Sequence, residues 1–263
     1  MRSGLRRAVA VHGNGFICLV MAVLFAGCAG ATITPETSTR PATKAAAARP
    51  TRIVVDNFVF AAAQVSENSG VGARVMNSLS STPASQRQEV IGKQAADALA
   101  AETVEQLGKL GFKAVRGNSS TTLGNGDLLI KGKFLNVDEG NRLRRLVIGF
   151  GAGASKLDTQ VNVYRVTAGE RQSLLQFRTH ADSGKMPGAA VTMGAGAAAQ
   201  GGVTAGMAAT NAAMSGGKLY TSQTEYLSDK TADQVVAYLS EYFAKQGWIS
   251  HEHAQKAKLT GAP

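Results

Sequence analysis

The sequence predicts an α/β protein with one mixed, mainly antiparallel sheet of about five strands, packed by amphipathic helices, plus a Gly/Ala-rich segment. Two observations predict this class. Runs of β-branched and alternating apolar residues follow one another through the middle of the chain. Before and after them, apolar residues recur at steps of three and four, as on a helix packed by one face. The expected order is β-α-β-β-β-β-α, with helices at both ends of a strand meander.

The expected strands are short and apolar, and turn residues separate several of them. Residues 64–84 are polar, contain two glycines and a proline, and are predicted to form a long loop before the first helix. Another turn is expected at 167–170, between two strands with alternating side chains. The predicted strands cover residues 52–60, 112–115, 127–137, 157–164 and 175–179.

Two helices are expected from their apolar stripes. Residues 86–110 carry isoleucine, alanine and leucine at helical spacing, and Gly111 is a plausible stop. Residues 232–246 carry valine, leucine and aromatic residues on one stripe. There Thr231 is the expected N-terminal cap and Gly247 the expected C-terminal stop.

Residues 1–27 have the three parts of a secretory signal peptide. Arg2, Arg6 and Arg7 form a basic start, the uncharged apolar run Phe16–Phe25 follows, and two small residues end the stretch. Ten helical residues rise only about 15 Å, which is half of a hydrocarbon core. The run is therefore expected to be a cleaved signal and not a lasting membrane span.

The stretch Leu24-Phe25-Ala26-Gly27-Cys28 resembles the lipobox of bacterial lipoproteins, although Phe25 stands where those proteins prefer leucine. The resemblance implies that Cys28 becomes the first residue and carries acyl chains. Each buried CH₂ contributes about 0.8 kcal/mol, so several chains anchor a protein almost permanently. Ala29 is compatible with the outer membrane. The expected location is therefore the bacterial cell envelope, on the outer membrane and facing the periplasm.

The remaining chain is expected to hold a lipidated, disordered tether over 28–50, because that stretch is rich in proline, alanine and threonine. A single α/β domain over 51–250 and a polar tail over 251–263 follow. The net charge of +10 falls to +7 without the three signal arginines. These basic residues are dispersed, and no nucleic-acid partner is expected. The domain contains no cysteine, which excludes disulfides and thiolate chemistry there.

A group of three arginines is the candidate anion-binding site. Arg142, Arg144 and Arg145 could hold a lipid phosphate or a sugar acid. The alternative is a solvated loop in which the preceding Asp138 and Glu139 pair with them.

Residues 186–217 are thirty-two consecutive residues without a charge, rich in glycine and alanine. Three interpretations remain open: a flexible surface loop, a small-residue helix packed on the domain or on another copy, and a membrane-inserting hairpin. Gly202 and Gly206 have the spacing of a close helix contact and are the candidate oligomer contact.

No catalytic, cofactor or metal site is predicted. The glycine run Gly149–Gly153 precedes a strand, whereas a dinucleotide loop must follow one and open a helix. The pair His251 and His253 lacks a third and fourth ligand. His180, two residues before Asp182, stands in no recognisable triad pattern.

Taken together, the lipobox, the strand from Ile53 to Phe60, the run Gly149–Gly153 after the arginines and the strand from Leu157 to Tyr164 resemble the DUF4410 family of bacterial lipoproteins of unassigned function. The resemblance covers roughly residues 51–247 and implies no catalytic residues. The expected function is a non-enzymatic, membrane-anchored envelope protein that binds a protein partner or assembles with itself. The alternative is an accessory binding protein for anionic lipid or glycan in envelope transport.

Overall fold

The computed structural model describes residues 30–38, 48–67, 70–140, 154–183 and 223–260. Their strands form one sheet in the order β1-β7-β6-β5-β2-β4, with β3 beside β5. The predicted α/β class is confirmed, with seven strands in place of about five. The strands are β1 Gly30–Ser38, β2 Ile53–Val55, β3 Val65–Ser66, β4 Ala114–Arg116, β5 Leu128–Asp138, β6 Lys156–Thr167 and β7 Glu170–Asp182. The helices are α2 Val71–Leu79, α3 Ala84–Lys109 and α8 Gln223–Lys245, with short 3₁₀ turns at Ala62–Gln64 and His251–His253.

The sheet has an antiparallel half and a parallel half. β1, β7, β6 and β5 pair antiparallel in that order, whereas β2 runs parallel to both β4 and β5. The turn between β6 and β7 lies at Ala168 and Gly169, whose φ values of 51° and 84° are both left-handed. Two such residues are the mark of a hairpin turn whose twist matches that of the flanking strands. The turn expected at 167–170 is confirmed.

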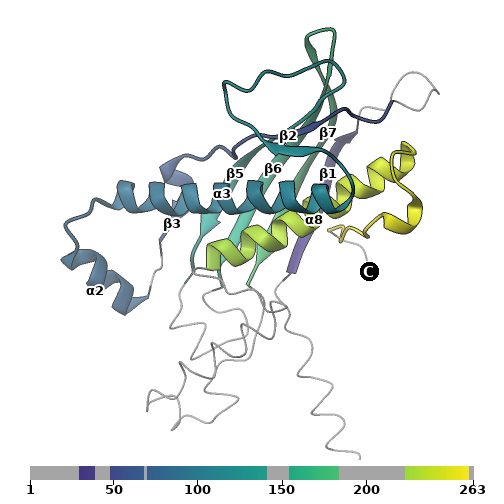
Figure 1. Ribbon diagram of the computed structural model, residues 1–263. Coiled ribbons are helices and arrows are strands. Elements are labelled where there is room, and N and C mark those ends of the chain that lie inside the picture. Colours follow the sequence, from purple (N-terminus) through teal and green to yellow (C-terminus); the bar gives the residue numbers. More distant parts are fainter. Residues whose placement is uncertain (1–29, 39–47, 68–69, 141–153, 184–222, 261–263) are drawn as a thin grey trace, which may run out of the picture.

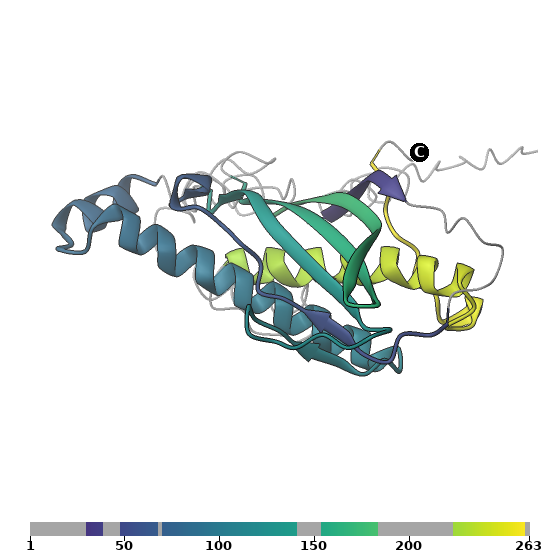
Figure 2. The ribbon, with the colours of Figure 1, turned by 90° about the horizontal axis from the view of Figure 1, so that it is seen from above.

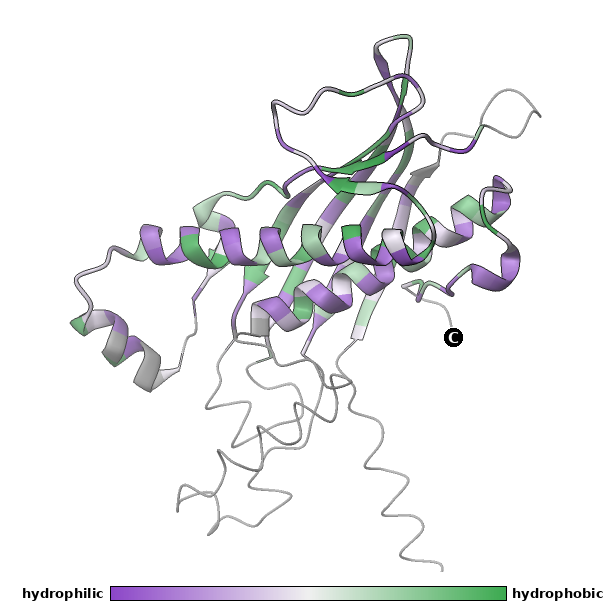
Figure 3. Cartoon of the chain, in the orientation of Figure 1, coloured by the Kyte–Doolittle hydropathy of each residue, from purple (hydrophilic) through white to green (hydrophobic). Residues whose placement is uncertain are grey.

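The two long helices cover one face of the sheet (Figures 1 and 2). α8 packs on β1, β7 and β6, and α3 packs on β2 and β4. Apolar and polar residues alternate along the strands (Figure 3), so each strand turns its apolar side to the helices. The largest side chains buried between sheet and helices include Phe134, Phe177, Phe243, Ile33 and Leu99.

Both long helices end in the same motif. In α3, Phe112 N–H donates to the Leu107 carbonyl at 3.1 Å and Gly111 adopts a φ of 81°. In α8, Trp248 N–H donates to the Phe243 carbonyl at 2.9 Å and Gly247 adopts a φ of 72°. These bonds, reaching back five residues across a left-handed glycine, define the Schellman motif. The two predicted glycine stops are therefore confirmed.

Three sequence-based boundaries are wrong. The strand expected over 52–60 is reduced to β2, after which Val59 makes a single bridge to Lys133. The loop expected over 64–84 contains helix α2. Its apolar residues Val71, Val75 and Leu79 recur at steps of four, but the glycines beside them suggested a loop. α8 begins at Gln223, so Thr231 lies buried inside the helix and is not its cap.

The disordered tether expected over 28–50 is corrected at residues 30–38, which form strand β1. Ala31 and Ile33 are buried against the rest of the core, with exposed fractions of 4% and 0%. The sequence suggested a tether because the stretch over 28–50 is rich in proline, alanine and threonine. Only two buried apolar residues, Ala31 and Ile33, fix β1 to the core. Part of the expected polar tail over 251–263 also belongs to the folded domain, since Ala257 is buried.

Gly132 on β5 offers a test of core packing. The Phe58 ring lies over this glycine and stacks on Phe134 at 5.9 Å between ring centres. A Cβ at residue 132 would come within 2.1 Å of the Phe58 ring. We expect Gly132→Ala to lower the free energy of unfolding by about 1–3 kcal/mol, measured by urea denaturation, because the ring has to move.

Gly108→Ala is the matched control, because nothing lies within 4 Å of a Cβ built there on helix α3. That substitution should leave the stability unchanged or raise it by up to about 1 kcal/mol. Equal effects of the two substitutions would contradict the packing described.

Candidate functional site on the uncovered sheet face

The candidate site is the face of the sheet that points away from α3 and α8. No helix of the described residues covers this face (Figure 2). Because side chains alternate along a strand, the residues between the buried ones on β1, β7, β6 and β5 point to it. They are partly or fully exposed and almost all polar: Thr32, Thr34, Glu36, Gln176, Arg178, His180, Asp182, Lys156, Asp158, Gln160, Asn162, Lys131, Lys133 and Asn136.

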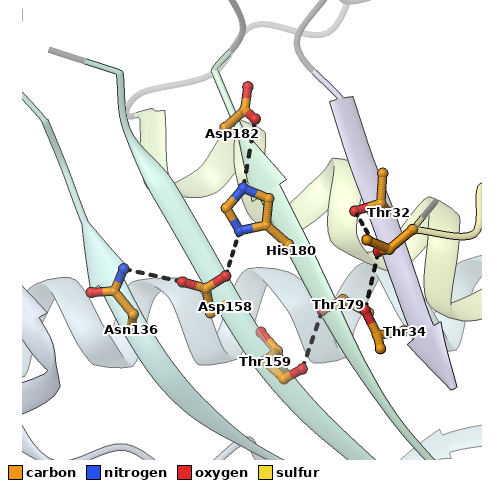
Figure 4. A network of polar contacts seen from close by, with 9 residues as sticks. Thr32, Thr34, Asn136, Asp158, Thr159, Thr179, His180 and Asp182 are labelled. Carbon is orange, nitrogen blue, oxygen red and sulfur yellow. Dashed lines mark hydrogen bonds and ion pairs between the residues drawn. The ribbon is translucent and has the colours of Figure 1, made fainter. Parts of the chain in front are cut away.

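A polar ladder crosses three of these strands, formed by Asn136, Asp158, His180 and Asp182 (Figure 4). Asn136 Nδ2 donates to Asp158 Oδ2 at 3.2 Å, and Asp158 Oδ1 lies 2.5 Å from His180 Nδ1. On its other side, His180 Nε2 lies 3.6 Å from Asp182 Oδ2. The imidazole side chain is 46% exposed, so the ladder is held in place from both sides yet reaches the solvent.

The neighbouring contacts tie the edge strand β1 to β7. Glu36 on β1 pairs with the Arg178 guanidinium and accepts a hydrogen bond from Gln176 Nε2 at 2.7 Å. These contacts cross strands where a β-bulge between Pro35 and Thr37 shifts the register. The charged and amide groups of this row therefore help to hold the outermost strand in place.

The outer edge of β1 is closed by the C-terminal part of the chain. Ile33 N–H donates to the Lys258 carbonyl at 2.7 Å, and Thr260 N–H donates to the Ile33 carbonyl at 2.8 Å. The hydroxyls of Thr34 and Thr260 lie 3.1 Å apart. Pro35 has no N–H to offer, which is a common protection of an edge strand against further pairing. This edge of the sheet is therefore occupied, and among the described residues the face beside it is exposed.

The ladder places a partly exposed imidazole between two carboxylates. Within the described residues the close polar partners of His180 are Asp158 and Asp182, which orient the ring. A serine–histidine contact occurs elsewhere, between Ser250 Oγ and His253 Nδ1 at 2.8 Å, as a local contact in an exposed turn. No group of three or more His, Cys, Asp or Glu side chains in the described ranges could hold a metal ion.

The tyrosines under the sheet belong to the core and not to this surface. Tyr238 packs against Phe177 from the helix side at 4.8 Å between ring centres. Burial raises the pKa of Tyr238, and the charge of Glu241 adds to this effect. Burial likewise raises the pKa of Tyr242, against the opposing effect of Arg165. Both hydroxyls therefore stay neutral at physiological pH.

Hollows in the surface lie near the N-terminal end of α3. One of about 360 Å³ is lined by Glu67, Asn77 and Arg87 among others. Its charged groups are already paired, since Arg87 Nε lies 2.9 Å from Glu67 Oε2 and Asn77 Nδ2 donates to the same oxygen at 2.7 Å. These contacts join the start of α3 to the segment before α2 and give the hollow a structural role.

The candidate residues expected from the sequence lie outside the described residues. These are Cys28, the arginines at 142, 144 and 145, and the glycines at 202 and 206. The ladder was not predicted, because its cross-strand partners depend on the register of β5, β6 and β7. The alternation of polar residues along those strands was the signal that could have pointed to this face.

The DUF4410 family model, described as a domain of unknown function, matches residues 53–200. This range is more than half of the chain. The chain belongs to the DUF4410 family. The matched range includes β2 to β7, whereas β1 and α8 lie outside it.

Two solved structures resemble this DUF4410 chain weakly. Both are PelC from Paraburkholderia phytofirmans, described as dodecamers. One, a point variant, has 12% identity and a TM-score of 0.29, with 59% of this chain and 81% of that chain covered. The other has 11% identity and a TM-score of 0.31, with coverages of 76% and 94%. At such low scores we transfer nothing from them. No curated protein matches the chain.

The ladder should contribute little to stability, because its contacts are partly exposed to solvent. We expect Asp158→Ala and His180→Ala each to lower the free energy of unfolding by no more than about 1 kcal/mol, because the pair is partly exposed. A double-mutant cycle in urea should give a coupling of about 0.2–1 kcal/mol. A loss of several kcal/mol would instead make the ladder part of the folding core.

Proposed function

We propose that the chain is a membrane-anchored, non-enzymatic envelope protein that presents the uncovered sheet face to other protein chains, a second copy of itself included. Its expected place is the outer membrane, facing the periplasm. The anchor is the acylated Cys28, released as the first residue when the apolar signal before it is removed.

The observation that carries the proposal is the position of β1. Residue 30 begins this strand, two residues after Cys28, and the same strand forms one side of the uncovered face. A polar surface that stays open beside an anchor is well placed to bind a partner held on the same membrane. None of the described helices is long and apolar enough to serve as a membrane span.

The anchor is tested by replacing its thiol. We expect Cys28→Ser to move the protein out of the membrane fraction and to remove the mass of the acyl chains, because several chains together account for nearly all of the membrane affinity. The measurements are fractionation and intact-mass spectrometry after expression in a Gram-negative host.

Cys18→Ser is the matched control. It changes the other cysteine, which lies inside the apolar run of the signal and is lost on cleavage. This variant should stay membrane-bound with an unchanged mass. Membrane retention of Cys28→Ser with no acyl mass in either variant would refute the anchor.

The interaction surface is tested with a photo-cross-linking amino acid placed on either side of the protein. Gln160 lies on the uncovered face between Arg178 and Lys133. Gln94 is exposed on the outer side of α3. We expect adducts in living cells from the position of Gln160 and few or none from that of Gln94.

The size of the adduct identifies the kind of contact. Twice the mass of the chain indicates a second copy, and any other fixed mass indicates a different protein. Equal adduct patterns at the two positions, or none at the position of Gln160, would rule out the sheet face as the interaction surface.

A further inference from the structure

We propose that the end of the sheet at which β1 begins lies directly against the lipid surface, so that the strands stand upright on the membrane and the turn between β6 and β7 points away from it. This inference rests on the proposed acylation of Cys28. It adds to that proposal the orientation of the domain and the part of it that touches lipid.

The first step is the length of chain between the anchor and the sheet. Consecutive Cα atoms are 3.8 Å apart, so the Cα of Cys28 lies within about 7.6 Å of that of Gly30, whatever path the chain takes. Gly30 is the first residue of β1 and pairs with Asp182. A lipid on Cys28 therefore holds the first residue pair of the sheet close to the bilayer.

The second step is that β1 is fixed to the body on both sides. Its register runs along β7 from Gly30 to Ser38, and Ala31 and Ile33 are buried. On the outer side, Ile33 exchanges two backbone hydrogen bonds with residues 258 and 260. A strand held in this way does not act as a flexible spacer, so the anchor point belongs to the folded domain.

The third step is the set of residues that share this end. Across the antiparallel strands, Gly30 pairs with Asp182, Asp182 with Lys156, and Lys156 with Asp138. Neighbouring strands are about 4.8 Å apart, so this row of four residues is about 14 Å wide. All of it lies near the level of the anchor. Among the described residues, the ends of β5 and β7 and the start of β6 therefore form the membrane-facing end.

The opposite end of the same strands lies far from the membrane. β6 has 12 residues, and a rise of about 3.3 Å per residue gives a length of about 36 Å. Its last residue, Thr167, leads into the turn at Ala168 and Gly169. The uncovered face then stands roughly perpendicular to the bilayer, and the ladder through His180 lies near the membrane-facing end of that face.

Electrostatics does not oppose this orientation strongly. In the membrane-facing row Lys156 stands between Asp138 and Asp182, so the charges alternate along it. A single charge near an anionic surface is worth about 1 kcal/mol, whereas each buried CH₂ of an acyl chain contributes about 0.8 kcal/mol. The acyl chains therefore dominate the few charges at this end.

The test compares two exposed residues at the opposite ends of one strand. Lys156→Cys and Thr167→Cys each add one thiol to a domain that has no cysteine. Each purified lipoprotein is labelled with a small fluorophore and reconstituted in phosphatidylcholine vesicles that carry a headgroup quencher. We expect at least twofold stronger quenching at residue 156. Equal quenching at the two positions would overturn the orientation.

A flexible insertion tests whether β1 sets the distance. Twenty Gly/Ser residues have a root-mean-square span of about 25 Å. Placed between Ala29 and Gly30, they should abolish the difference between the two labels. The same insertion between Arg40 and Pro41 is the control, because it follows β1 and leaves the anchor at its original distance from the sheet. Loss of the difference in both constructions, or in neither, would contradict the role of β1.

The mass of each variant separates this inference from the proposed function. The protein without an added cysteine takes up label only if its Cys28 thiol is free, so it serves as the blank. A chain that carries no acyl groups and does not float with vesicles would overturn both proposals. A chain that is acylated, floats with vesicles and shows equal quenching would overturn the orientation alone.

Discussion

The pairing of β1 with β7 is the interaction on which the rest of the surface depends. It supplies the last strand of the uncovered face, and it buries two apolar residues, Ala31 and Ile33, against the core. The hydrogen bonds from residues 258 and 260 close its outer edge. Without this strand, β7 would become an exposed edge with a row of unpaired backbone groups, which is the usual starting point of aggregation.

The two faces of the sheet serve different purposes because their side chains alternate. The inner face carries fully buried side chains such as Phe134, Phe177 and Val161, and burial of this apolar face under α3 and α8 stabilises the fold. The outer face carries partly exposed ion pairs and amide contacts, each worth little to stability. Substitutions on the outer face should therefore cost less stability than substitutions on the inner face.

Periodicity in the sequence predicted the elements whose signals are local. The apolar stripe of α3, its stop at Gly111 and the hairpin turn at Ala168 and Gly169 follow from short-range spacing and backbone freedom. β1 and α2 escaped prediction, because a proline within β1 and glycines at the start of α2 suggested loops, and the burial that fixes β1 comes from distant segments. The ladder escaped for the same reason, since Asp158 and His180 meet through strand register across 22 positions of sequence.

The closure of β1 by the end of the chain has a consequence for the order of folding. Thr34 and Thr260 meet across 226 positions of sequence, and contacts between such distant segments form late because the loop between them must first be ordered. The segment that forms β1 precedes the residues that close its outer edge by 226 positions, so this edge is completed after the pairings between neighbouring strands. We therefore expect the completed outer edge of β1 to mark the moment when the domain reaches its final form.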